Sequence, residues 1–183
     1  MTDSLGPEHD DLPPEAEPRS PRFDAPEPPH PVNWNLLTAN DLEAELLELN
    51  RWVDWLRHTY GLPASVVPPY WHRHPELLWE LSALHLHWLC AYDPDMSGSA
   101  PLGWHRDFAD ARNRLREWVA ASGTRLDRDR PTRQTTWPGE DPAPPVEDVI
   151  IADRGEDFVQ FVFDQVEARR LAALQIFLDE HAP

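Results

Sequence analysis

The sequence contains no lysine, and all 16 of its basic residues are arginine. Without lysine the chain cannot form a Schiff base with a carbonyl substrate, and it cannot supply the lysine of a phosphate-binding loop. Two large classes of enzyme are therefore excluded. The one cysteine, Cys90, cannot form an internal disulfide, and its apolar surroundings in the sequence indicate an inert buried thiol in a reducing compartment.

Long uncharged apolar runs are also missing. No segment reaches the roughly 18 residues of a membrane span, and the first ten residues are acidic where a secretory signal would be basic. We therefore expect a cytoplasmic protein with no membrane partner. Nucleophile-elbow and phosphate-loop motifs are absent too, so we predict no catalytic residues, no cofactor and no enzymatic activity.

Residues 1–31 hold 9 of the 21 prolines, many of the acidic residues and few large apolar side chains. Such a segment buries too little surface to offset the entropy of ordering it. The sequence predicts a disordered, acidic, proline-rich arm. Two uses remain open for it, a solubilising tail or a polyproline segment that docks on a partner.

Residues 32–126 are predicted to form a bundle of three core helices, at about 39–60, 75–92 and 102–122. Apolar residues recur there at alternating spacings of three and four, which is typical of amphipathic helices. Thr38 is suited to cap the first helix, Pro75 to open the second, and Gly61 and Gly123 to end the first and third. The expected fold class is all-α.

The remaining chain divides into a proline-rich linker or wrapping segment, residues 127–147, and a C-terminal unit, residues 148–183. The run Val149–Ile151 favours a short strand, and a further helix is expected from about 156 to 179. One side of that helix is expected to carry Val159, Val162, Phe163, Val166, Ala173 and Phe177.

The helix at 75–92 is apolar around most of its circumference, because Trp79, Leu86 and Cys90 lie opposite its main leucine stripe. Either the C-terminal helix or a second subunit has to cover that side. The leading hypothesis is a non-enzymatic interaction or accessory protein that binds a protein partner or forms a homo-oligomer. Its predicted contact residues are Trp79, Leu86, Trp137, Phe163 and Phe177.

A local basic patch offers an alternative. Residues 106–133 contain eight arginines and five acidic residues, although the whole chain has a net charge of −17. Guanidinium groups suit phosphates, so a nucleic-acid-associated protein is the second hypothesis, acting through Arg125, Arg128, Arg130 and Arg133. The acidity of the chain favours pairing of these arginines within the protein or with a protein partner.

Histidines near the second helix suggest a third hypothesis, a metal-dependent enzyme. A metal centre needs three or four converging ligands, and helical ligands are normally three or four residues apart. His85 and His87 are two apart and point to different sides of a helix. We therefore predict no metal ligands, and we expect these histidines to be structural or exposed.

The segments Trp71–Glu76 and Gly103–Asp110, with Leu81, Leu84, Trp88 and Leu115, resemble an uncharacterised actinobacterial family associated with plasmids, phages and integrated conjugative elements. The resemblance covers about residues 50–120, and the C-terminal third departs from it. An actinobacterial source also agrees with the use of arginine in place of lysine and with only three isoleucines. The resemblance implies a mobile-element setting and no particular reaction.

Overall fold

The computed structural model describes residues 29–181, so most of the predicted N-terminal arm lies outside the described residues. The described chain is mainly helical, which confirms the all-α prediction. Its elements in order are α1 (Ala39–Tyr60), the 3₁₀ helix η1 (Trp71–Arg73), α2 (Pro75–Ala91), α3 (Ala100–Ser122), β1 (Arg128–Asp129), β2 (Val149–Ile150) and α4 (Arg154–Glu180).

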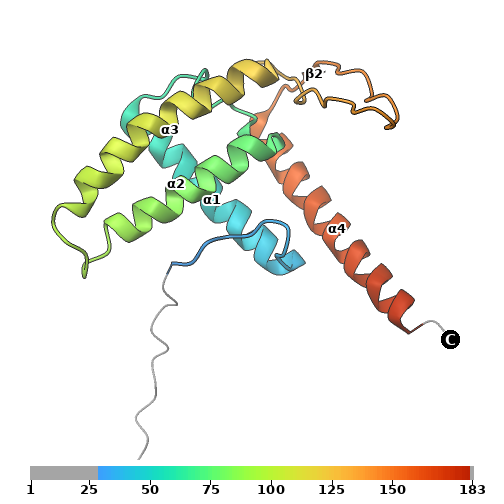
Figure 1. Cartoon of the computed structure of the whole chain (residues 1–183), viewed down its shortest axis with the longest axis horizontal. Coiled ribbons are helices and arrows are strands. Elements are labelled where there is room, and N and C mark those ends of the chain that lie inside the picture. Colours follow the sequence, from blue (N-terminus) through green and yellow to red (C-terminus); the bar gives the residue numbers. More distant parts are fainter. Residues whose placement is uncertain (1–28, 182–183) are drawn as a thin grey trace, which may run out of the picture.

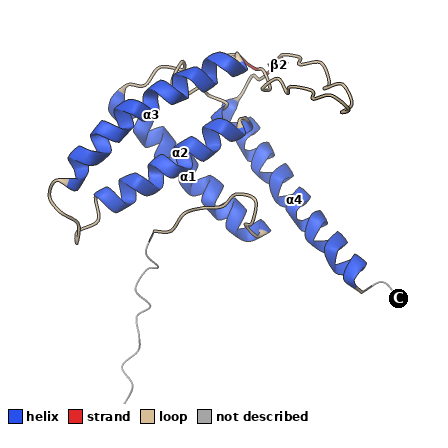
Figure 2. Ribbon diagram, viewed as in Figure 1, coloured by secondary structure: helices blue, strands red, loops and turns tan. Residues whose placement is uncertain are grey.

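The helices α2 and α3 form an antiparallel hairpin, and α1 packs across α2 (Figures 1 and 2). The helix α4 packs against α1 and η1, then runs diagonally away from the hairpin toward the C-terminus (Figure 1). The sequence left open whether α4 covers α2. The helix α4 does not cover α2, because the two helices make no contact.

The helix ends follow local sequence signals. Thr38 Oγ1 accepts a hydrogen bond from the Asp41 amide at 3.2 Å and donates one to the Asp41 carboxylate at 2.7 Å. Gly61 and Gly123 close α1 and α3 in the left-handed conformation, with φ of 58° and 74°, which costs little for glycine. The predicted bounds of all four long helices are therefore confirmed to within two residues.

Substituting Thr38 by alanine should lower the free energy of unfolding by about 1 kcal/mol, because the Asp41 amide loses its acceptor. Thr59→Ala is the matched control, since Thr59 lies exposed near the other end of α1. Urea denaturation measures both. Equal stability of the two variants would contradict a capping role for Thr38.

The core consists mainly of leucine and tryptophan. Trp104 is fully buried, stacks on Phe108 with ring centroids 4.8 Å apart, and donates its indole N–H to the Leu84 carbonyl at 3.4 Å. Trp52 is also buried, and its ring clusters with those of Trp55 and Trp88 at the contact of α1 with α2.

Other tryptophans have different roles. Trp34 and Trp71 are buried and anchor irregular segments to the bundle. The outer rings of Trp55, Trp79 and Trp118 remain substantially exposed. The prediction that helical tryptophans fill the core and seams is thus correct for only some of them.

The two short strands tie the C-terminal third to the bundle. They pair antiparallel, with Arg128 opposite Ile150 and Asp129 opposite Val149. The β-prone run at Val149 therefore forms β2, as expected. The loop between the strands leaves the bundle and returns to it (Figure 1).

Candidate interaction surface

The first half of α4 is held on the bundle by side chains spaced four residues apart. Phe158, Val162 and Val166 are buried and lie on one helix face. This face docks on α1 and η1. Near its end, Arg169 donates to the backbone carbonyls of Asn35 and Trp34, at 2.7 and 2.9 Å.

The second half of α4 has no such cover. From Arg170 to Glu180 every residue is exposed, although this stretch is rich in apolar side chains. At 1.5 Å per residue it projects about 16 Å beyond the docked part. The exposed apolar side chains of α4 are Val159, Phe163, Leu171, Leu174, Ile176, Phe177 and Leu178.

Most of these side chains share one side of the helix. At 100° per residue they fall within a sector about 120° wide, and only Ile176 points elsewhere. We call this set the α4 stripe; it comprises Val159, Phe163, Leu171, Leu174, Phe177 and Leu178.

Two predicted contact residues lie on the α4 stripe. Phe163 and Phe177 are 58% and 55% exposed. The predicted apolar side of α4 was wrong in part, because Val162 and Val166 are buried against the bundle while Phe163 remains largely exposed. The predicted contact residues did not include Leu171, Leu174 and Leu178, although the spacing of these leucines by three and four residues is typical of one helix face.

The other predicted contact residues lie elsewhere. Trp79 is exposed and Leu86 is half-buried, and a separation of seven residues puts them on one face of α2. Trp137 is exposed in the loop between the strands. Because α2 does not contact α4, the structure does not bring these three residues together with the α4 stripe.

Two of the four arginines of the nucleic-acid hypothesis pair with aspartates of the chain. Arg128 lies 2.9 Å from Asp127, and Arg130 lies 2.6 Å from Asp148. Both contacts hold the pKa of these arginines above its ordinary value through hydrogen bonding to the carboxylates. Arg125 and Arg133 are exposed and make no ion pair with residues 29–181.

Two histidines are buried against aspartates from distant parts of the chain. His74 Nε2 lies 2.7 Å from Asp129 of β1, and His74 Nδ1 lies 3.3 Å from Thr132 Oγ1. The side chain of His74, the residue before α2, makes no cap hydrogen bond to that helix. It joins α2 to β1 instead.

The second pair joins η1 to α4. The His72 ring donates through Nε2 to Asp157 at 2.9 Å, and Arg73 binds the same carboxylate with two nitrogens. Burial lowers the pKa of His72 to about 4, although its hydrogen bond to Asp157 opposes the shift. Burial would raise the pKa of Asp157, but hydrogen bonds from Arg73 and His72 outweigh it and lower that pKa.

The histidines of α2 point to different sides, as predicted. The His85 ring stacks near Trp52 with centroids 4.8 Å apart, whereas His87 Nε2 lies 3.1 Å from Asp107. Across residues 29–181, no three side chains of the types that bind metals converge on a common point. Cys90 is a partly buried free thiol.

Within residues 29–181, no helix has both the length and the apolar character needed to cross a membrane.

Comparison with known proteins found no matching family model, no matching curated protein and no matching solved structure.

Proposed function

We propose that this protein is a non-enzymatic self-association module, and that α4 is the element through which two copies bind. The α4 stripe carries the proposal. The stretch Arg170–Glu180 is only about three turns long, and isolated helices of that length are marginal in water. A partner that covers the leucines of this stretch would stabilise both the helix and its apolar side chains.

The partner we propose is a second copy, crossing antiparallel at Leu174. In that arrangement Leu171 of one copy meets Phe177 of the other, and the two Arg170 side chains lie on opposite sides of the crossing. A parallel pair would instead place Arg170 of one copy beside Arg170 of the other. Avoiding this like-charge contact favours the antiparallel crossing, in which the two copies are equivalent.

The free energy that burial of these side chains can supply indicates a weak dimer. Four half-exposed apolar side chains per copy would each gain about 1 kcal/mol on burial, or roughly 8 kcal/mol for the pair. Association costs about 4–15 kcal/mol in lost freedom. Even the lowest of these costs leaves only about 4 kcal/mol, so dimers should become populated only as the protein concentration approaches about 1 mM.

Sedimentation velocity at protein concentrations up to about 1 mM tests the proposal. Leu174→Asp should leave the protein monomeric, because two carboxylates would meet at the centre of the crossing. Leu102→Asp is the matched control, since Leu102 is 74% exposed on α3 and lies outside the α4 stripe. It should associate like the unmodified chain.

A strict monomer at every concentration, or equal association of Leu174→Asp and the unmodified chain, would contradict the proposal. The resemblance to mobile-element proteins is compatible with an accessory role of this kind.

A further inference from the structure

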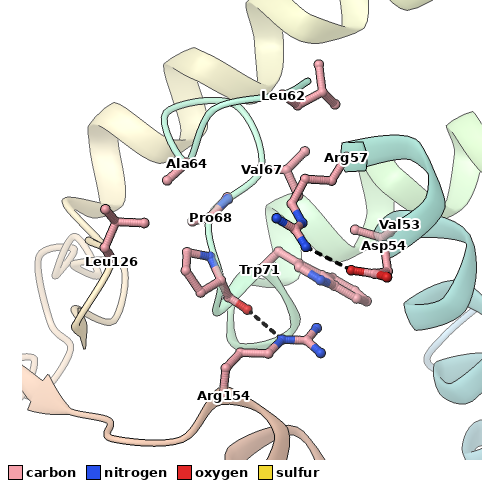
Figure 3. Close-up of a pocket in the computed structure, with 11 residues that line it drawn as sticks. Val53, Asp54, Arg57, Leu62, Ala64, Val67, Pro68, Trp71, Leu126 and Arg154 are labelled. Atoms are coloured by element: carbon pink, nitrogen blue, oxygen red, sulfur yellow. Dashed lines mark hydrogen bonds and ion pairs between the residues drawn. The ribbon is translucent and has the colours of Figure 1, made fainter. Parts of the chain in front are cut away.

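A cavity lies between α1, the loop that follows it, and the start of α4, at the other end of α4 from Leu171, Leu174 and Leu178. It encloses about 320 Å³. Protein interiors rarely contain voids much larger than a water molecule, so a space of this size is suited to solvent or a ligand. Its walls are mostly apolar and include Val53, Leu62, Val67, Pro68, Trp71 and Leu126 (Figure 3).

The loop that forms one wall is rigid. Pro68 and Pro69 fix its backbone, and the Val66 amide donates to the Pro63 carbonyl at 2.9 Å. Tyr70 ties this wall to the C-terminal third, because its hydroxyl lies 3.2 Å from the Leu126 carbonyl. The cavity is therefore preformed and does not need a ligand to open it.

Arg154 is the unusual group in this cavity. Its Nε donates to the Pro69 carbonyl at 3.1 Å, its Nη2 donates to the Asn50 side chain, and its guanidinium lies over the Phe158 ring at 5.1 Å. All of these partners are uncharged. No carboxylate of residues 29–181 lies within 4.0 Å of Arg154, whereas Arg73 and Arg114 both have one.

A partly buried cation without a counter-charge is costly, and the structure shows the expected consequence, because burial lowers the pKa of Arg154. Nη1 makes no hydrogen bond with any described residue and keeps its two N–H donors for a ligand. An oxyanion in the cavity would supply the missing charge and would accept hydrogen bonds from Nη1.

The other ionic groups at the cavity limit the charge of that anion. Arg57 and Asp54 form an ion pair at 3.0 Å on α1, and both are well exposed (Figure 3). Together with Arg154 they give the cavity a net charge of one positive unit. This balance suits a single negative charge and disfavours a multiply charged phosphate.

We propose that this cavity binds a small monocarboxylic acid with an apolar body. The carboxylate accepts hydrogen bonds from Arg154 Nη1, and the apolar body contacts Leu126 and Ala64, which are the more accessible apolar residues of the lining. The site does not depend on self-association through α4.

Phenylacetate is a suitable probe, with phenylacetamide as its neutral analogue and inorganic phosphate as a second anion. Heteronuclear NMR titration of the full chain should show saturable shifts at cavity residues with phenylacetate. Its dissociation constant should be about tenfold lower than that of the amide, because the charged hydrogen bond is lost in the amide.

Amino-acid substitutions test whether phenylacetate binds in this cavity. Arg154→Gln should weaken phenylacetate binding about tenfold and leave amide binding unchanged. Ala64→Met should block both ligands by filling the cavity, whereas Ala83→Met, at an exposed position of α2, should bind like the unmodified chain.

Three outcomes would overturn the proposal. They are equal affinity for acid and amide, unchanged binding in Ala64→Met, and tighter binding of phosphate than of phenylacetate. Ala64→Met retains Arg154, so the test holds even if Arg154→Gln fails to fold. Since Leu174→Asp should still bind phenylacetate, failure of the self-association proposal can be told apart from failure of this one.

Discussion

Asp157→Ala is expected to lower the free energy of unfolding by about 3–5 kcal/mol, the usual cost of removing one partner from a buried ion pair. Asp157 is almost wholly buried and is the only carboxylate among the described residues that contacts both His72 and Arg73. Its removal leaves the Arg73 charge and the His72 N–H without acceptors. Arg73 is about a third exposed, which favours the lower end of the range.

Urea denaturation at fixed protein concentration measures this loss. Asp164→Ala is the matched control, because Asp164 is an exposed aspartate of the same helix that accepts only from Gln160 in the described structure. The control should change stability by less than about 0.5 kcal/mol. Similar losses in the two variants would show that the contact of Asp157 with η1 does not hold α4 in place.

Stability should also fall as the pH drops from about 6.5 to about 4, and His72 should account for much of the fall. In the folded protein burial lowers the pKa of His72 to about 4, whereas the unfolded chain has an ordinary histidine. Within this window the unfolded state binds a proton that the folded state does not. The stabilisation is complete above the unfolded pKa and is lost toward the folded one, by up to about 1.4 kcal/mol per pH unit.

The free energy of unfolding of His72→Gln, measured against pH, tests this directly. The variant should have a shallower slope between pH 4 and 6.5 than the unmodified chain, whatever its absolute stability. His58→Gln, at an exposed position of α1, should keep the original slope. The lowered pKa of Asp157 acts only at more acidic pH, so it does not confuse the comparison. An identical slope in His72→Gln would contradict the assignment.

These contacts give the segment Trp71–Glu76 a physical role. Trp71 is buried in the core, His72 and Arg73 bind α4 through Asp157, and His74 binds β1 through Asp129. The segment therefore joins the bundle to the C-terminal third. It also fixes the direction in which α4 leaves the bundle, and so the position of the α4 stripe.

Much of the fold could be predicted because its signals are local. The alternating leucines of α1, the Thr38 cap and the glycines after α1 and α3 act within a few residues of where they stand. The same locality made Phe163 and Phe177 recognisable as candidate contact residues. Local signals could not show that Val162 is buried and Phe163 exposed, because both residues fit an apolar side of an isolated helix.

The candidate sites depended on contacts between distant residues. Arg128 and Arg130 looked available for phosphate until their pairing with Asp127 and Asp148 was visible. The cavity at Arg154 was not predictable, since its walls come from α1, the following loop, Leu126 and α4. Such a cavity leaves no periodic pattern in the sequence, because segments far apart in the chain form its walls.

The sequence by itself determined where the helices begin and end, because caps, glycines and apolar spacing act through short-range hydrogen bonds and side-chain geometry. Only the tertiary structure decided that α4 docks on α1 and η1 and not on α2. This docking combines the burial of Phe158, Val162 and Val166 with the contact of His72 with Asp157, across 85 residues. The contact of His74 with Asp129, across 55 residues, joins α2 to β1. Pairings at such separations leave no pattern in the chain, because their specificity comes from burial and charge in the folded state.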